Sequence, residues 1–147
     1  MKAFDLEGLT ISEIAPLIRK KQISPLELTQ RYLERIKRLN PRLNAYLAMT
    51  EEGALAAARR VEREISKGNY RGPLHGIPFS IKDNIALKGV TTTAGSKILS
   101  DWVPDFDATV DERLKEAGAV ILGKTNMHEW AKGSNSINPF YGTSHNP

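Results

Sequence analysis

Hydrophobic positions recur every three or four residues through the first half of the chain, and this spacing predicts three consecutive helices. Their expected ranges are about 10–21, 24–40 and 50–68. The second helix has the clearest start, because Ser24 can cap it, Pro25 suits its first position and Glu27 can reach back to the Ser24 N–H. Asn40-Pro41 is expected to end this helix. A short extended segment at 45–49 precedes the third helix, which Thr50 caps.

In the second half the pattern changes to short apolar runs interrupted by glycine and proline, which predicts strands and loops. Residues 77–82 form one strand, and residues 119–123 form a fully apolar strand of the kind buried in parallel sheets. A helix at 108–117, stopped by Gly118, precedes the second of these strands, and this order indicates an α/β fold. Loops are expected at 89–96 and 133–147, with a short helix at 126–132.

The composition is that of one folded globular domain, since 147 residues with 40% hydrophobic and 26% charged residues can bury a core. No apolar run approaches the roughly 18 residues that a membrane span needs, and residues 1–8 lack the apolar core of a signal peptide. We therefore expect a cytoplasmic protein that does not contact a membrane. The absence of cysteine excludes disulfides, a thiol nucleophile and zinc sites built on thiolates.

The net charge of +4 is unevenly distributed, which raises the question of nucleic-acid binding. Residues 1–71 carry 14 Lys/Arg and 9 Asp/Glu, a net charge of +5, whereas residues 72–147 carry 7 and 8, a net charge of −1. The helical arginines alternate with glutamates, which is typical of solvated faces with i, i+4 ion pairs. RNA binding by these helices is therefore the less favoured interpretation. The arginines are Arg31, Arg35, Arg38, Arg42, Arg59, Arg60 and Arg63.

The residue pattern indicates neither a metal site nor a cofactor. A helical zinc motif needs a second histidine four residues after the first, and the His128-Glu129 pair lacks it. We expect all three histidines in loops or at the surface: His75, His128 and His145. Four aspartates lack the glycine and terminal glutamate of a calcium loop: Asp101, Asp105, Asp107 and Asp111. They are expected to form a solvated helix start that Asp107 or Thr109 caps.

Lys82 is the strongest candidate for chemistry, because it ends an apolar strand that we expect to be buried and stands beside Asp83. A lysine in such a position either pairs with a carboxylate or loses its proton. In the first case Lys82 reaches solvent or pairs with Asp83. In the second case its neutral amine serves as a base. Spacing alone favours the first interpretation.

Three motifs follow one another in a fixed order along the chain. Residues 72–85, GPLHGIPFSIKDNI, resemble the lysine segment of the amidase signature family. The later segments 92–96, TTAGS, and 123–131, GKTNMHEWA, match in the same order. The helix start at Ser24 and the tail 141–147 also fit. The resemblance spans essentially the whole chain.

This resemblance implies hydrolysis of amide bonds by a Ser-Ser-Lys triad, a relative of the Ser-Lys arrangements on other folds. By analogy Lys82 is the base, kept unprotonated by burial beside Ile81 and Phe79, and it activates a bridging serine that in turn activates the nucleophilic serine. In the family both serines lie in a Gly/Ser-rich motif shortly after the segment that ends here at Pro147. The serines of this chain have no matching context: Ser96, Ser134, Ser136 and Ser144. The chain alone is therefore expected to be inactive.

The resemblance also implies the architecture and partners of residues 1–147. It implies N-terminal helices packed on a mixed sheet, an incomplete portion of the amidase signature fold. The helical part covers about 1–71, and the strand and loop part with the lysine motif covers about 72–147. Because an incomplete sheet exposes unpaired edges, we expect pairing with the missing C-terminal amidase segment or with a second copy.

Two branches of the family fit the motifs, general amidases and the A subunit of aminoacyl-tRNA amidotransferase, which uses glutamine as amide donor. The second branch usually has Asp and Phe where this chain has His128 and Trp130. This difference favours a general amidase that acts on a small-molecule amide, and tRNA binding is not expected. The alternative outside the enzymes is a non-catalytic basic fragment that binds RNA or a partner protein.

Overall fold

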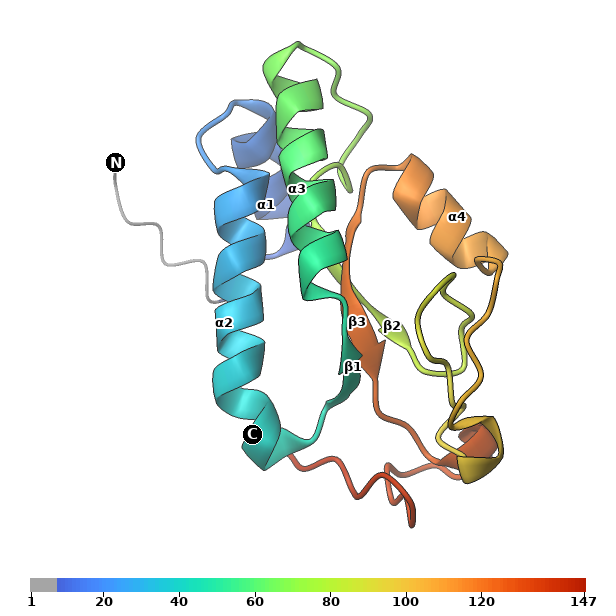
Figure 1. Ribbon diagram of the computed structural model, residues 1–147. Coiled ribbons are helices and arrows are strands. Elements are labelled where there is room, and N and C mark those ends of the chain that lie inside the picture. Colours follow the sequence, from blue (N-terminus) through green and yellow to red (C-terminus); the bar gives the residue numbers. More distant parts are fainter. Residues whose placement is uncertain (1–7) are drawn as a thin grey trace.

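The computed structural model describes residues 8–147 and has four α-helices around a three-stranded sheet (Figure 1). The helices are α1 (Ile11–Arg19), α2 (Pro25–Leu43), α3 (Glu51–Ser66) and α4 (Thr109–Glu116). The strands are β1 (Tyr46–Met49), β2 (Pro78–Lys82) and β3 (Val120–Thr125), and two short 3-10 turns span Lys97–Leu99 and Glu129–Ala131. The predicted α/β class and the three strand positions are confirmed. The segment 1–8, considered above for a signal peptide, lies outside the described residues except for Gly8.

The sheet is mixed, as expected, and β3 is its central strand in the order β1-β3-β2. β1 runs antiparallel to β3, with Tyr46 opposite Thr125. β2 runs parallel to β3, with Lys82 opposite Thr125. Both β1 and β2 are therefore edge strands of the described sheet, whereas β3 has a neighbouring strand on each side. The buried first half of β3 corresponds to the apolar strand predicted at 119–123.

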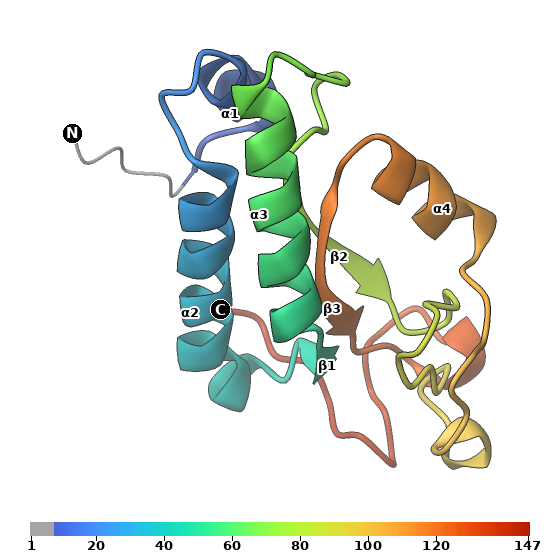
Figure 2. The same cartoon turned by 45° about the horizontal axis from the view of Figure 1, so that its top comes forward.

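Helices cover both faces of the sheet. α2 and α3 lie side by side on one face (Figures 1 and 2), where Leu33 and Ala58 form a buried cluster with Val120 and Leu122 of β3. α4 covers the other face, where Leu114 packs against a cluster that contains Ile81 and Ile121. No helix among the described residues combines the length and the apolar character that a bilayer crossing requires.

The predicted end of the second helix is wrong, because α2 continues through Pro41 to Leu43. Contacts with the following strand support this extra turn. The side-chain amide of Asn40 donates through its nitrogen to the Tyr46 carbonyl (3.0 Å) and accepts through its oxygen from the Tyr46 N–H (2.8 Å). Asn44 then ends the helix in the left-handed conformation (φ 49°), with its N–H bonded to the Asn40 main-chain carbonyl. Asparagine tolerates this conformation better than most residues.

Three other local predictions also differ from the structure. Ala108 stands at the N-cap of α4, so neither Asp107 nor Thr109 caps it, and Asp107 instead accepts a hydrogen bond from the Lys88 N–H (2.8 Å). Thr50 is the N-cap residue of α3, but its hydroxyl donates to the Ile121 carbonyl (2.8 Å). The expected helix at 126–132 is only the 3-10 turn Glu129–Ala131.

Candidate active site at the carboxyl ends of β2 and β3

The parallel strands β2 and β3 end at the same edge of the sheet, where Lys82 lies opposite Thr125 and Ile81 opposite Lys124. In sheets of this type, ligands bind outside the carboxyl ends of the parallel strands. The lysine singled out in the sequence therefore lies where an α/β fold usually carries its chemistry.

The predicted burial of Lys82 is wrong for this chain, because its side chain is exposed. Successive residues of a strand point to opposite faces, and Ile81, only 3% exposed, occupies the buried face toward α4. Lys82 is the last residue of an edge strand, so the described residues do not cover it. The apolar residues of the strand around Lys82 predicted burial, and they do not show that the strand lies at the edge of the sheet.

Asp83, which follows Lys82, is almost completely buried and turns away from its neighbour. One carboxylate oxygen accepts hydrogen bonds from the Thr93 N–H (3.1 Å) and the Thr93 hydroxyl. The other lies 3.6 Å from the Nζ of Lys124. Residues 8–147 contain no ion pair between Lys82 and Asp83, so the structure does not support the interpretation that these two residues pair.

Lys124 is the buried lysine of this region, with no exposed surface. Its ammonium group donates to the main-chain carbonyl of Ile85 and to the hydroxyl of Thr92 (2.7 Å). Burial lowers the pKa of Lys124, and the Asp83 carboxylate opposes this effect. Sequence reasoning missed Lys124, although it follows an apolar run just as Lys82 does.

Asp111 of α4 is a second buried carboxylate near this cluster. Neither of its side-chain oxygens has a hydrogen-bond partner, and the residue has no exposed surface. Burial raises the pKa of Asp111, while the charges of Lys115 and Lys124 oppose the rise. The prediction that Asp111 belongs to a solvated helix start is therefore wrong.

Asparagine side chains attach the C-terminal tail to the same edge of the sheet. The buried Asn138 donates to the carbonyls of Gly95 (2.7 Å) and Met127 (2.9 Å). Asn44 donates to the Tyr141 carbonyl (2.8 Å), and Asn126 donates to the Gly142 carbonyl (3.1 Å). The tail is a loop, as predicted, but these bonds fix its path beside β1 and β3.

No serine in residues 8–147 forms a nucleophile-base pair with Lys82. Ser96 is buried, donates to a Glu129 carboxylate oxygen (2.6 Å) and accepts from the Ile98 N–H (3.3 Å). Ser144 donates to the Asn44 carbonyl (3.1 Å), and Ser80 bonds with the Tyr46 hydroxyl. These serines have structural partners, and none of them is bonded to Lys82 in the described part of the chain.

All three histidines lie in loops or short turns, as expected, but His75 is buried, whereas His128 is half-buried and His145 is exposed. The Arg71 N–H donates to Nδ1 of His75 (3.1 Å), so Nε2 carries the proton and donates to the Glu64 carboxylate (3.1 Å). Burial lowers the pKa of His75. Across residues 8–147 no group of three His, Cys, Asp or Glu side chains is arranged to hold a metal ion.

The basic helical faces carry the ion pairs that their charge pattern predicts. Arg31 pairs with Glu27 one helical turn away (2.7 Å). Lys37 pairs with Glu51 (2.7 Å) between α2 and α3. Such exposed pairs are typical of solvated surfaces.

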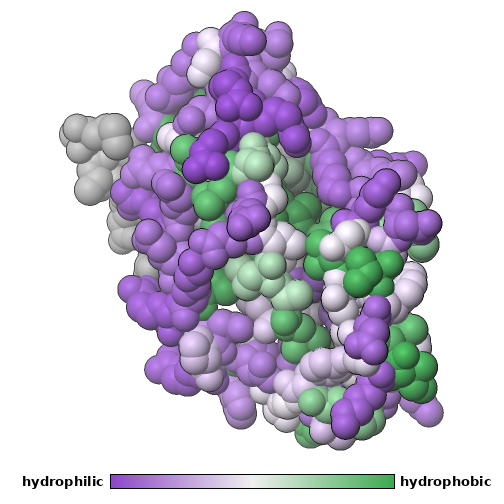
Figure 3. Space-filling view, viewed as in Figure 1, coloured by the Kyte–Doolittle hydropathy of each residue, from purple (hydrophilic) through white to green (hydrophobic). Residues whose placement is uncertain are grey.

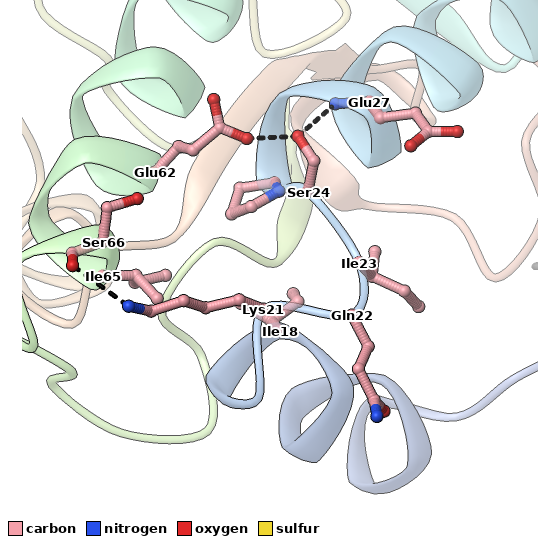
Figure 4. A pocket seen from close by; sticks show the side chains of 10 residues that line it. Ile18, Lys21, Gln22, Ile23, Ser24, Glu27, Glu62, Ile65 and Ser66 are labelled. Carbon is pink, nitrogen blue, oxygen red and sulfur yellow. Dashed lines mark hydrogen bonds between the residues drawn. The ribbon is translucent and has the colours of Figure 1, made fainter. Parts of the chain in front are cut away.

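A pocket of about 220 Å³ lies near the C-terminal end of α3, away from the carboxyl end of β2 (Figure 4). Several of its polar groups are bonded to one another: Ser24 caps α2 and bonds with Glu62, and the ammonium group of Lys21 donates to the Ser66 carbonyl (3.1 Å). The pocket is therefore a by-product of the α1–α2 connection and is separate from Lys82.

Comparisons with known proteins agree on one family. A family model described as Amidase matches residues 27–147. The A subunits of glutamyl-tRNA(Gln) amidotransferase from Salinispora tropica and Moorella thermoacetica are each 46% identical to the chain over 97% of its length. The peptide amidase from Stenotrophomonas maltophilia has a TM-score of 0.84 at 39% identity over 94% of the chain. A structure from a vestigial complex related to an s-triazine catabolic enzyme has a TM-score of 0.91 at 35% identity over 95% of the chain.

The chain spans less than a third of the length of these relatives. It covers 29% of each of the two amidotransferase subunits. It covers 29% of the peptide amidase and 31% of the s-triazine-related protein.

Proposed function

Because the chain belongs to the amidase family, we propose that it supplies the lysine base of a Ser-Ser-Lys site for amide hydrolysis. Lys82 is the base, and both serines come from outside residues 1–147. The observation that carries the proposal is the position of Lys82: it ends a parallel strand at the carboxyl edge of the sheet and is free of its neighbouring carboxylate.

In this proposal the Lys82 amine accepts a proton from a bridging serine, which takes the proton of the nucleophilic serine. The nucleophile attacks the amide carbonyl carbon, and the C–N bond breaks after a proton returns to the leaving amine. Water then hydrolyses the acyl-enzyme and regenerates the serine. The amine must be unprotonated to begin this sequence, and an exposed lysine is mostly protonated at neutral pH. A further surface must therefore cover Lys82 in the active protein.

We propose that this surface is the remaining part of an amidase domain, supplied in the same chain or as a separate one. Exposed large hydrophobic residues cluster in 98–140, whereas the described part before it has only Ile11 and Met49. Figure 3 shows hydrophobic residues on the side of the molecule occupied by α4 and the adjacent loops. The free edge of β2 adds unpaired backbone groups. The exposed residues are Ile98, Trp102, Val103, Phe106, Val110, Trp130, Ile137 and Phe140.

Hydrolysis of a small-molecule amide is the preferred activity, because His128 and Trp130 differ from the residues usual in the tRNA-dependent branch. Ion pairs on α2 and α3, Arg31 with Glu27 and Lys37 with Glu51, neutralise part of the positive charge that phosphates would attract, which supports our proposal that tRNA is not a partner. The second candidate is the glutamine-hydrolysing A subunit of a tRNA amidotransferase. The 46% identity to two such subunits supports it.

The test is an ammonia-release assay on the chain with and without a second polypeptide that carries the remaining length of one of these relatives. We expect no hydrolysis of primary amides by either piece and measurable hydrolysis by the mixture. Glutamine as the preferred substrate, with tRNA binding at physiological salt, would favour the second candidate. A mixture that forms a complex but hydrolyses neither glutamine nor other amides would contradict both.

A further inference from the structure

Lys82 and Asp83 are consecutive, yet their side chains have opposite environments. Lys82 is exposed, whereas Asp83 is 1% exposed. The backbone of Asp83 is also fixed, because its N–H donates to the Thr125 carbonyl (3.1 Å) and its carbonyl accepts from the Ala94 N–H (3.1 Å). The end of β2 is thus tied to β3 on one side and to the loop around residue 94 on the other.

A lysine that acts as a base must be able to lose its proton, and this arrangement keeps a negative charge away from its amine. A carboxylate next to an amine favours the protonated amine, which cannot accept another proton. If the Asp83 side chain were free to rotate, it would be the nearest anion to Lys82. In the structure its oxygens are occupied by Thr93 and Lys124 instead.

We propose that Lys124 is a positioning residue for Lys82: by holding the Asp83 carboxylate in the interior, it keeps that negative charge away from the amine. The inference rests on the proposed role of Lys82 as the base. Lys124 reaches Asp83 from β3 and also donates to Ile85 and Thr92. One buried ammonium group therefore joins β2, β3 and the loop that follows Lys82.

Two buried carboxylates, Asp83 and Asp111, oppose the effect of burial on the pKa of Lys124. Only Asp83 forms an ion pair with Lys124 in the described residues (3.6 Å). Asp111 has no hydrogen-bond partner, whereas Asp83 has three donors around it. These contacts identify Asp83, and not Asp111, as the carboxylate that Lys124 holds in place.

The test measures the reactivity of the Lys82 amine in the chain itself, without any need for enzymatic activity. Acetic anhydride at limiting concentration and pH 8 acylates only unprotonated amines, and mass spectrometry reports the labelling of each lysine. In Lys124→Met we expect labelling of Lys82 to fall about threefold, because the released Asp83 charge favours its protonated form. Labelling of the exposed Lys20 serves as the internal reference. Lys88→Met is the matched control, since it removes an exposed lysine from the same loop.

The control variant is expected to leave Lys82 labelling unchanged. Unchanged Lys82 labelling in a folded Lys124→Met would overturn the inference. Because removal of one partner of a buried ion pair can prevent folding, Lys124→Gln, which keeps a donor, is the second variant. If neither single variant folds, the double variant Lys124→Met with Asp83→Asn provides the test. This double variant should fold and label Lys82 at least as fast as the unmodified chain, and an unfolded or slower-labelled double variant would contradict the inference.

These outcomes are independent of the proposed function. An active reconstituted enzyme with Lys82→Arg would contradict the proposal that Lys82 is the base, whatever the labelling shows. Unchanged labelling would remove the role of Lys124 while leaving Lys82 as a candidate base.

Discussion

The Asp111 carboxylate lies in the interior with both oxygens lacking a donor, and burial raises its pKa above the ordinary value. We predict that Asp111→Asn stabilises the chain by about 1–3 kcal/mol at pH 7, since an ionised buried carboxylate without partners is costly. The folded chain holds the Asp111 proton to a higher pH than the unfolded chain, so stability falls as pH rises above about 4 through the raised pKa.

Urea unfolding at pH 4 and at pH 7 checks this prediction. The gain from Asp111→Asn should be large at pH 7 and nearly absent at pH 4. Asp105→Asn, at an exposed position, is the matched control and should have little effect at either pH. A gain of equal size at both pH values would contradict the assignment.

A comparison of Lys82 with Lys124 shows what sequence reasoning can establish for single residues. Both follow an apolar run near the end of a strand, yet Lys82 is exposed and Lys124 is fully buried. The difference arises because β2 is an edge strand and β3 is central, and this strand order is not encoded in the local pattern. The sequence identified the lysine motif but not the buried lysine that pairs with Asp83.

Among the structural elements, the turn between α4 and β3 gives a sharp prediction. Gly118 has φ +82°, and a Cβ there would lie 2.1 Å from a ring carbon of the buried His75. Gly68, after α3, has φ +89° but no atom within 4 Å of its virtual Cβ. Gly68→Ala should therefore cost about 1 kcal/mol for the backbone alone. Gly118→Ala should cost about 2 kcal/mol more, because of the clash with His75.

Thermal or urea unfolding of the two alanine variants measures this difference directly. Equal destabilisation by the two substitutions would show that the contact between Gly118 and His75 is not tight. The same turn also shows why α4 ends where the sequence predicts, since glycine is the favoured residue at a left-handed helix end.

The existence of the helices and strands was predictable because periodicity reports which face is buried. Their ends were less predictable. α2 extends past Pro41 through bonds between Asn40 and Tyr46 and between Asn44 and Tyr141, and the second partner lies 97 positions away in the chain. Such contacts form only in the assembled fold, so no local sequence pattern predicts them.

For the molecule as a whole, the exposed apolar residues and the free edge of β2 predict self-association of the chain in isolation. Light scattering coupled to size-exclusion chromatography should show dimers or larger species at micromolar concentration. Phe106→Ser should reduce association, since Phe106 is 53% exposed and contributes large apolar area. Ile11→Ser, at an exposed position on α1, is the matched control. A monodisperse monomer with cooperative unfolding would contradict the prediction.

The most direct measurement of the central claim is the amide-hydrolysis rate of the reconstituted protein with Lys82→Arg. If Lys82 is the base, this variant should lose at least about 10²-fold in rate, as Lys82→Ala should, because guanidinium keeps its proton throughout the working pH range. The rate of the unmodified protein should rise with pH as the amine loses its proton. As a folding control, both variants of the isolated chain should keep the melting behaviour of the unmodified chain, since Lys82 is exposed there. A folded Lys82→Arg protein that hydrolyses amides at the unmodified rate would contradict the account.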